Sequence, residues 1–326
     1  MTAAKGLGRD LWSTAGMPGS PAWPQPQPRA QSLPRLSAAR VPLTREVLVV
    51  ASDGTQRRLP LAAERALTLY VDRQELVTLM TLGQEPELLS LGYLLNQGLV
   101  AGASEVESIT VDWEVGAAAV RTVRGVSGLA GKLAKRTVTT GCGQGTVFGD
   151  WLDRVAPLPP ATSASEAGSV PHATLVQILD TMRRLPSIHR EAGSVHGTAL
   201  WRVRGGNGEH AEQGDEGPQM LVHIEDVGRH NAVDTVAGWM AMNGATGTDC
   251  WLYTTGRLTS EMVLKAAHLR LPLVVSRNGA TAMGQQLAEQ LNLTLIGRAS
   301  GERYLCYSGA ERLALAVPTP TVAVSG

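Results

Sequence analysis

Strand-like and helix-like segments alternate through the C-terminal part of the chain, and this alternation constrains the fold more than any other feature of the sequence. Helical patterns at 231–242, 260–269 and 280–291 alternate with short apolar runs at 249–255, 271–276 and 293–299, and a further strand pattern follows at 303–308. A helical pattern at 172–185 and strand patterns at 197–206 and 219–228 precede them. Such alternation predicts a sheet with helices packed on its faces.

Residues 42–126 have mostly strand patterns. An Asp-Gly turn at 53–54 predicts a hairpin over 45–61, and alternating residues over 65–82 and 106–126 predict further strands. One helix is predicted at 83–98, where Leu88, Leu91 and Leu95 fall at helical spacing between Pro86 and Gly98. We therefore expect an α/β protein (α+β overall) with a small N-terminal α+β domain at 41–155 and a layered α/β domain at 156–326.

The first 40 residues contain the run "PAWPQPQP" and show no apolar periodicity, which predicts a disordered extension over 1–40. Lys and Arg together number 29, as do Asp and Glu, so no overall field favours nucleic acid. No apolar run reaches the length of a membrane span and no signal peptide is recognisable, so no membrane association and a cytoplasmic location are expected.

The chain has three cysteines, too few for a disulfide framework, which indicates a reducing compartment. Cys142 lies between glycines in "TTGCGQG", downstream of Lys132, Lys135 and Arg136. Exposure and positive surroundings favour a thiolate, which can accept and pass on a persulfide sulfur. The local residues by themselves also fit an unreactive surface cysteine. Cys250 and Cys306 lie in strand patterns and are expected to be buried and inert.

Several polar segments are candidates for a ligand site. The turns "YTTGRLTSEMV" and "VVSRNGATAMG" place Arg257 with Thr259, and Arg277 with Thr281, where helices begin. Helix N-termini beside arginines suit phosphate, although capping alone explains the threonines. "EDVGRHNAVD", with Asp226, Arg229 and His230, fits either a solvated helix start or a site-forming turn.

His223 and Glu225 form half of the H-x-E…P-C-x-x-C signature of zinc deaminases. The cysteine half does not follow downstream, so no zinc is expected.

Several segments in order resemble the FdhD family of formate dehydrogenase accessory sulfurtransferases over about residues 42–315. The resemblance rests on "LSLGYLLNQGLV", "TTGCGQG", "SVHGTALW", "HIEDVGRHNAVD", "TTGRLTSEMVLKAA" and "NLTLIGRASGERYLCYSG". It implies a sulfur carrier that takes sulfur from a cysteine desulfurase. The sulfur goes to the bis(molybdopterin guanine dinucleotide) molybdenum cofactor before that cofactor enters formate dehydrogenase. A cytidine-deaminase-like C-terminal domain and a homodimer are also implied.

The resemblance assigns the persulfide to Cys142 and places Gly145 where the family has a second loop cysteine. It assigns cofactor binding to the segment Arg298, Ala299, Ser300, Gly301, Glu302 and Arg303. We expect the cofactor phosphates to meet Arg257, Arg277, Arg298 and Arg303 and the two helix N-termini at Thr259 and Thr281. Asp226, Arg229 and His230 are expected to bind the cofactor near the path to molybdenum, where they could orient or protonate the ligand. Two alternatives stay open. One is a cofactor-binding chaperone without sulfur transfer, and the other is a deaminase-like nucleotide hydrolase.

Overall fold

The computed structural model describes residues 32–126, 155–159, 169–203 and 217–314, and two short strands, β8 (Thr137–Val138) and β9 (Gly145–Thr146). Cys142 and most of the predicted extension lie outside the described residues. Residues Leu33–Gly326 cluster as one compact unit. The predicted domain boundaries stay a prediction.

The N-terminal part forms a five-stranded sheet in the order β1-β6-β7-β4-β5. The strands are β1 (Arg35–Leu36), β4 (Arg65–Val71), β5 (Gln74–Thr81), β6 (Val106–Asp112) and β7 (Ala117–Thr122), and the short helix η1 (Ala103–Glu105) leads into β6. Helix α1 (Pro86–Asn96) packs on the sheet through Leu89, Leu91, Leu94 and Leu95. The predicted helix and the strand patterns over 65–82 and 106–126 are confirmed.

Strand β1 lies inside the range predicted to be disordered. It pairs in parallel with the edge of β6, and the Glu87 carboxylate accepts hydrogen bonds from Ser37 Oγ and Ala39 N at 2.5 and 2.9 Å. The prediction of disorder is therefore wrong for the part of the predicted extension that contains β1 and reaches Ala39. A two-residue strand that depends on a distant partner has no periodicity, so the sequence did not predict it.

The C-terminal part forms a six-stranded sheet in the order β12-β11-β13-β14-β15-β16. Its strands are β11 (His196–Arg202), β12 (Gln219–Asp226), β13 (Cys250–Thr254), β14 (Leu273–Ser276), β15 (Thr294–Ser300) and β16 (Arg303–Ser308). Strands β13, β14 and β15 are parallel, and the remaining pairs are antiparallel.

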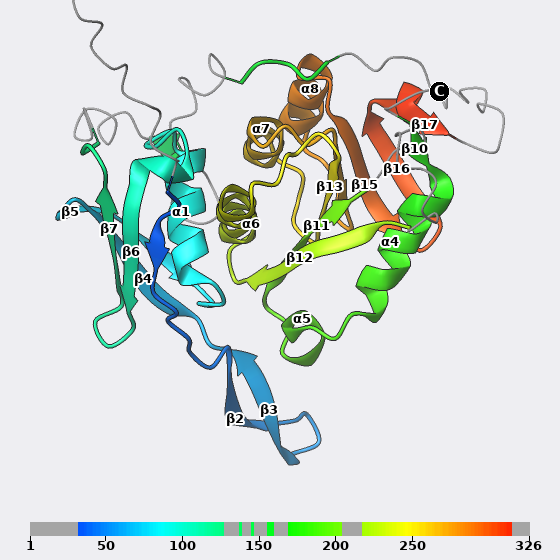
Figure 1. Ribbon diagram of the computed structural model, residues 1–326. Coiled ribbons are helices and arrows are strands. Elements are labelled where there is room, and N and C mark those ends of the chain that lie inside the picture. Colours follow the sequence, from blue (N-terminus) through cyan, green and yellow to red (C-terminus); the bar gives the residue numbers. More distant parts are fainter. Residues whose placement is uncertain are drawn as a thin grey trace, which may run out of the picture. The chain divides into compact units, whose positions relative to one another are not determined.

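Helices cover both faces of this sheet (Figure 1), as the alternation predicts. Helices α6 (Arg229–Asn243), α7 (Ser260–His268) and α8 (Ala282–Gln290) share one core with the sheet. Helix α4 (His172–Arg184) packs on the opposite face through Leu175, Ile178 and Leu179, and the short α5 (Ile188–Glu191) follows it. At one end, β10 (Val170–Pro171) pairs with β17 (Leu313–Ala314), which follows η2 (Ala310–Arg312). No helix in the described ranges is both long and apolar enough to cross a membrane.

Helices α1 and α6 pack against each other between the two sheets (Figure 1). Glycines allow the close approach: a Cβ at Gly92 would lie 1.6 Å from the Asp234 carbonyl oxygen, and one at Gly238 would lie 2.0 Å from the Leu88 carbonyl oxygen. The two sheets are thus joined by a helix pair whose backbones nearly touch.

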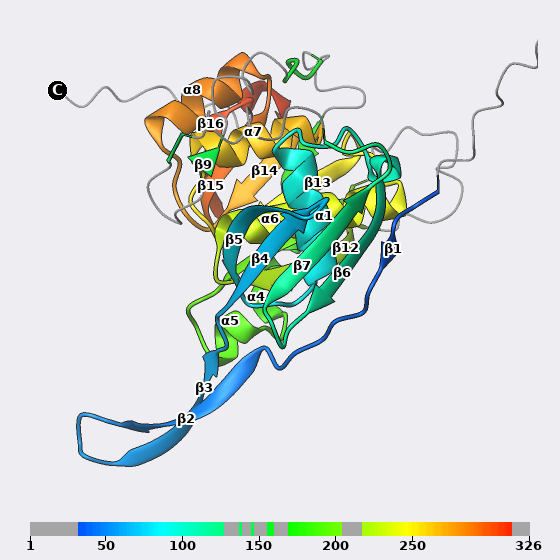
Figure 2. The same cartoon turned by 90° about the vertical axis from the view of Figure 1, so that its left-hand side faces the viewer.

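The predicted hairpin at 45–61 is present as β2 (Thr44–Val50) and β3 (Gln56–Ala62), with Gly54 at φ +78° in the turn. These strands form a separate two-stranded sheet that extends away from the larger sheets (Figure 2).

Candidate functional site

One edge of the C-terminal sheet collects most of the predicted site residues. The parallel strands β13, β14 and β15 all end there, and the antiparallel neighbours bring the start of β11 and the end of β12 to the same edge. In open α/β sheets, ligands bind beyond the carboxyl ends of parallel strands. We call this edge, with the turns that leave it, the carboxyl edge.

The two turns predicted to bind phosphate lie side by side at the carboxyl edge. Leu258 N donates to Gly279 O at 3.1 Å, and Thr281 N donates to Leu258 O at 3.0 Å. Arg298 N donates to Asn278 O at 2.9 Å, which brings the third predicted segment next to the second turn. The structure therefore joins three segments that are up to about 40 residues apart in the sequence.

The two threonines at the helix starts differ. Thr281 caps α8, because its Oγ1 accepts a hydrogen bond from Gly284 N at 3.1 Å. Thr259 does not cap α7 through its side chain, and its buried Oγ1 has no hydrogen-bond partner among the described residues. Helix capping therefore accounts for the threonine at 281. It does not account for Thr259, whose hydroxyl group can form a hydrogen bond with a ligand.

The predicted cofactor segment forms the end of β15, a turn, and the start of β16. Arg298 (φ +51°) and Gly301 (φ +58°) are in the left-handed region, and Ser300 pairs with Arg303 across the turn. Arg298, Ser300, Glu302 and Arg303 are exposed, as are Arg257 and Arg277 in the neighbouring turns. Ala299 is an exception: its side chain is buried in the core with α4, so only its backbone can face a ligand.

Basic groups surround His230 at the start of α6. Burial, followed by the charges of Lys265, Arg229, His196 and Arg257, lowers the pKa of His230 to about 2. Burial, followed by Arg229, His189 and Arg257, also lowers the pKa of His196. Several cationic side chains therefore lie around the two neutral imidazoles. Such an environment attracts an anion.

The carboxylate of Glu261 fixes the orientation of the His230 ring. Its Nε2 lies 3.3 Å from Glu261 Oε2, while its buried Nδ1 has no hydrogen-bond partner among the described residues. If Nε2–H donates to Glu261, Nδ1 carries a lone pair that can accept a hydrogen bond. Behind it, Lys265 Nζ contacts Asp234 Oδ1 and Oδ2 at 2.7 and 2.8 Å, and Asn96 Nδ2 donates to Asp234 Oδ1 at 2.6 Å.

The other polar residues of "EDVGRHNAVD" hold the fold together. Asp226 accepts hydrogen bonds from Thr81 Oγ1, Leu82 N, Gly228 N and Asn231 Nδ2. The Glu225 carboxylate accepts from Ile188 N and His189 N at 2.7 and 2.9 Å, at the start of α5. The expectation that Asp226 acts on a ligand is therefore wrong, because both of its oxygens are engaged by the protein.

A cavity of about 180 Å³ lies at the same edge, on the side of α4 and α5. Its polar lining includes residues that sequence reasoning did not assign to a site, namely Arg183, His189, Arg190 and Tyr253, together with His223, Glu225 and Arg277. The signal that could have found Arg183 is the basic pair that ends the amphipathic helix at 172–185. His189 and Arg190 follow it in the short polar segment "SIHR", which has no pattern that indicates a site.

His223 lies inside β12, three residues before its end. Across the ranges that the structure describes, no cluster of three or more His, Cys, Asp or Glu side chains is arranged to hold a metal ion.

The prediction that both strand cysteines are buried is confirmed for Cys250 but not for Cys306. Cys250 is fully buried, and burial raises the pKa of its thiol to about 12. Cys306 is half-buried, and burial raises the pKa of its thiol to about 11. Neither forms an appreciable thiolate at neutral pH, which leaves Cys142 as the candidate nucleophile.

Comparison with known proteins agrees with this arrangement. The model of the FdhD/NarQ family matches residues 62–314. The sulfur carrier protein FdhD of Bacillus subtilis (strain 168) is 28% identical over 253 residues, which cover 78% of this chain and 90% of the relative. The FdhD protein of Listeria monocytogenes serotype 4b (strain F2365) is 28% identical over 255 residues, or 77% of this chain and 90% of the relative.

A crystal structure from Desulfotalea psychrophila, assigned as a formate dehydrogenase accessory protein, shares the fold. Its TM-score is 0.62 at 25% identity, and the match covers 83% of this chain and all of that chain.

Proposed function

Because the chain belongs to the FdhD/NarQ family, we propose that it is a sulfur carrier in the maturation of formate dehydrogenase. In this proposal Cys142 accepts sulfur from a cysteine desulfurase and passes it to the bis(molybdopterin guanine dinucleotide) molybdenum cofactor. The observation that carries the proposal is the shielding of the other two cysteines, whose thiols have pKa values of about 12 and 11. The role is consistent with the names of the relatives, which are called sulfur carrier proteins.

The first step is a thiol–persulfide exchange. The Cys142 thiolate attacks the terminal sulfur of the desulfurase persulfide, and the S–S bond of the donor breaks. A new S–S bond forms on Cys142, and the donor cysteine leaves as a thiolate. No redox co-reactant is needed, because the sulfane sulfur moves without a net change in oxidation state.

The carboxyl edge supplies the proposed docking site for the cofactor, which is the substrate here. Exposed Arg257, Arg277 and Arg298 would bind its phosphates, and the Thr259 hydroxyl would add a hydrogen bond. Because the pKa of His230 is about 2, this side chain stays neutral and orients the ligand through Nδ1. It does not serve as an imidazolium acid.

Intact-mass measurement tests the carrier step. After incubation with a cysteine desulfurase and cysteine, the wild-type chain should gain the mass of one sulfur atom, and this gain should disappear on reduction. Cys142→Ala should abolish both the gain and formate dehydrogenase activity in a complemented deletion strain. The matched control Cys306→Ala should keep both. Full activity with Cys142→Ala would overturn the proposal.

Gly145 favours one alternative, because it stands where the family has a second loop cysteine. A cofactor-binding chaperone without sulfur transfer would show no mass gain in the same experiment and would still bind a guanine nucleotide such as GDP.

A further inference from the structure

A row of buried polar side chains leads from the crossing of α1 and α6 to the carboxyl edge. In order, the row consists of Asn96, Asp234, Lys265, Glu261 and His230, and each of these residues is at most 7% exposed. Asn96 lies in α1, Asp234 and His230 lie in α6, and the other two lie in α7. Buried polar atoms are normally paired within the protein, so an unpaired atom at the end of such a row needs an explanation.

Within this row, each contact holds the next side chain in place. Asn96 Nδ2 donates to Asp234 Oδ1 at 2.6 Å, and Lys265 Nζ donates to Asp234 Oδ1 and Oδ2 at 2.7 and 2.8 Å. Lys265 Nζ also lies 3.9 Å from Glu261 Oε1, while Glu261 Oε2 faces His230 Nε2 at 3.3 Å. The two oxygens of the Glu261 carboxylate therefore have different partners, the lysine on one side and the imidazole on the other.

The contact with Glu261 determines which nitrogen of the His230 ring carries the proton. A carboxylate only accepts hydrogen bonds, so a lone pair on Nε2 would face it unfavourably. The neutral ring therefore carries its proton on Nε2 and a lone pair on Nδ1, because the partner of one nitrogen sets the state of the other. A second proton is disfavoured, since burial and the neighbouring charges lower the pKa of His230 to about 2. At neutral pH, Nδ1 is thus only an acceptor.

This acceptor has no donor in the protein. His230 Nδ1 is buried and has no hydrogen-bond partner within the ranges that the structure describes. Burial of an unpaired acceptor destabilises a folded chain, so its presence at the ligand site indicates that the ligand supplies the missing donor. The ionised phosphates of a dinucleotide cannot do so, because their oxygens are acceptors as well. The group that meets Nδ1 must therefore be an N–H or O–H group.

We propose that His230 and Glu261 form a donor-selective subsite. In it, His230 Nδ1 accepts a hydrogen bond from an N–H or O–H group on the nucleoside or pterin part of the ligand, and Glu261 is the positioning residue that keeps Nδ1 unprotonated. The inference rests on the proposed docking of the cofactor and refines it, because the arginines of the carboxyl edge bind the phosphates while His230 selects a different part of the same ligand. The amino and ring N–H groups that guanine and pterins share are donors of this kind.

Nitrogen NMR of the full-length chain, labelled at histidine, tests the role of Glu261 without any ligand. At neutral pH the wild-type His230 ring should be protonated on Nε2 alone, and His230→Gln identifies its signals. Glu261→Leu should convert the ring into a mixture of both tautomers, whereas Glu261→Gln should retain the wild-type pattern, because its amide oxygen can still accept from Nε2–H. A wild-type ring protonated on Nδ1, or an unchanged ring in Glu261→Leu, would refute the positioning role.

Ligand titrations followed by the same NMR signals test the selectivity. GDP carries the nucleoside donors, pterin-6-carboxylate carries the pterin donors, and sulfate is an acceptor only. Glu261→Leu should weaken binding of GDP or of the pterin by about tenfold, the loss of one hydrogen bond, and should leave sulfate binding unchanged. The weakened probe identifies the source of the donor. Unchanged affinity for both donor-bearing probes would refute the subsite alone, whereas a wild-type chain that binds none of the three would remove the docking site as well.

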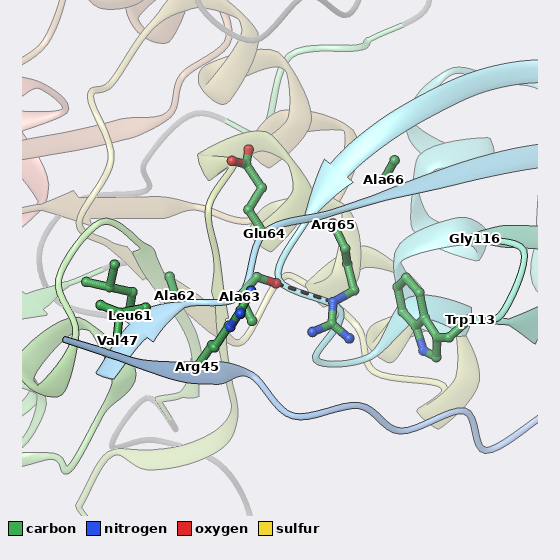
Figure 3. A pocket seen from close by; sticks show the side chains of 10 residues that line it. All are labelled: Arg45, Val47, Leu61, Ala62, Ala63, Glu64, Arg65, Ala66, Trp113 and Gly116. Carbon is green, nitrogen blue, oxygen red and sulfur yellow. Dashed lines mark hydrogen bonds between the residues drawn. The ribbon is translucent and has the colours of Figure 1, made fainter. Parts of the chain in front are cut away.

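A second basic hollow, at the base of the β2–β3 hairpin, supplies the control. This groove of about 560 Å³ is lined by Arg45 and Arg65, among others (Figure 3). Arg65 is engaged by the protein, since its Nε donates to Ala63 O at 3.3 Å and its guanidinium lies 5.5 Å from the centre of the Trp113 ring. Arg45→Ala removes an exposed cation from the groove and should change neither the three affinities nor the His230 signals. Weaker binding of GDP and the pterin in Arg45→Ala would place the ligand in this groove and contradict the assignment to His230.

Discussion

At the scale of single residues, the chemistry of His230 depends on neighbours that are distant in the sequence. Glu261 and Lys265 come from α7, His196 comes from β11, and Arg257 comes from the turn that connects β13 to α7. The sequence identified His230 as a site residue but left open whether it orients or protonates a ligand. Burial among cations favours orientation, because the neutral imidazole has no acidic proton to give at physiological pH.

The burial of His230 predicts a dependence of stability on pH. Its folded pKa of about 2 is below the unfolded value of about 6.5, so the unfolded state binds the extra proton first as the pH falls. The contribution of His230 to the free energy of unfolding is therefore constant above about pH 6.5. Well below that value the free energy of unfolding falls by about 1.4 kcal/mol per pH unit. Urea unfolding of wild type and His230→Gln between pH 7 and pH 4 should show a shallower slope for the variant. Equal slopes would contradict this.

At the scale of elements, α1 and α6 differ from ordinary amphipathic helices. Apolar spacing predicted both helices correctly, but it indicates one buried face, whereas nearly every residue of α1 is buried. Similarly, α6 buries Arg229, His230, Asn231 and Asp234 along with its apolar residues. A helix between two sheets needs no solvent-facing stripe, so its sequence does not reveal which neighbours cover it.

The crossing of these helices should not tolerate a side chain at Gly92. A Cβ there would lie 1.6 Å from the Asp234 carbonyl oxygen, so Gly92→Ala must push the helices apart. We expect a loss of about 3 kcal/mol or more in the free energy of unfolding. The control Gly102→Ala meets only Ser104 Oγ at 3.9 Å and should cost less than about 0.5 kcal/mol. Denaturant titration measures both, and similar values for the two variants would refute the steric argument.

At the scale of the whole molecule, Asp226 connects the two sheets. Its carboxylate joins Thr81 and Leu82 at the end of β5 to Gly228 and Asn231 at the start of α6. The two sheets should therefore unfold in one cooperative transition.

Removing the Asp226 carboxylate should weaken that coupling. Asp226→Ala leaves several buried donors unpaired, which should cost at least about 3 kcal/mol. It should also allow amides of β4 and β5 to exchange before those of β13 and β14. Asp53→Ala is the control, because Asp53 likewise accepts bonds from Thr55 N and Oγ1 but lies in the exposed hairpin turn. A single transition of unchanged stability in Asp226→Ala would show that the carboxylate does not join the sheets.

The sequence by itself determined the local elements, the burial of Cys250, and the segments that form the carboxyl edge. Each of these follows from short-range patterns: apolar period, turn residues and helix starts. Tertiary structure alone decided that Asp226 and Glu225 support the fold, that Ala299 faces the core, and that Arg183 and Arg190 line a cavity beside Arg277. Those roles arise from contacts between residues far apart in the chain, and no local pattern specifies which distant group a side chain will meet.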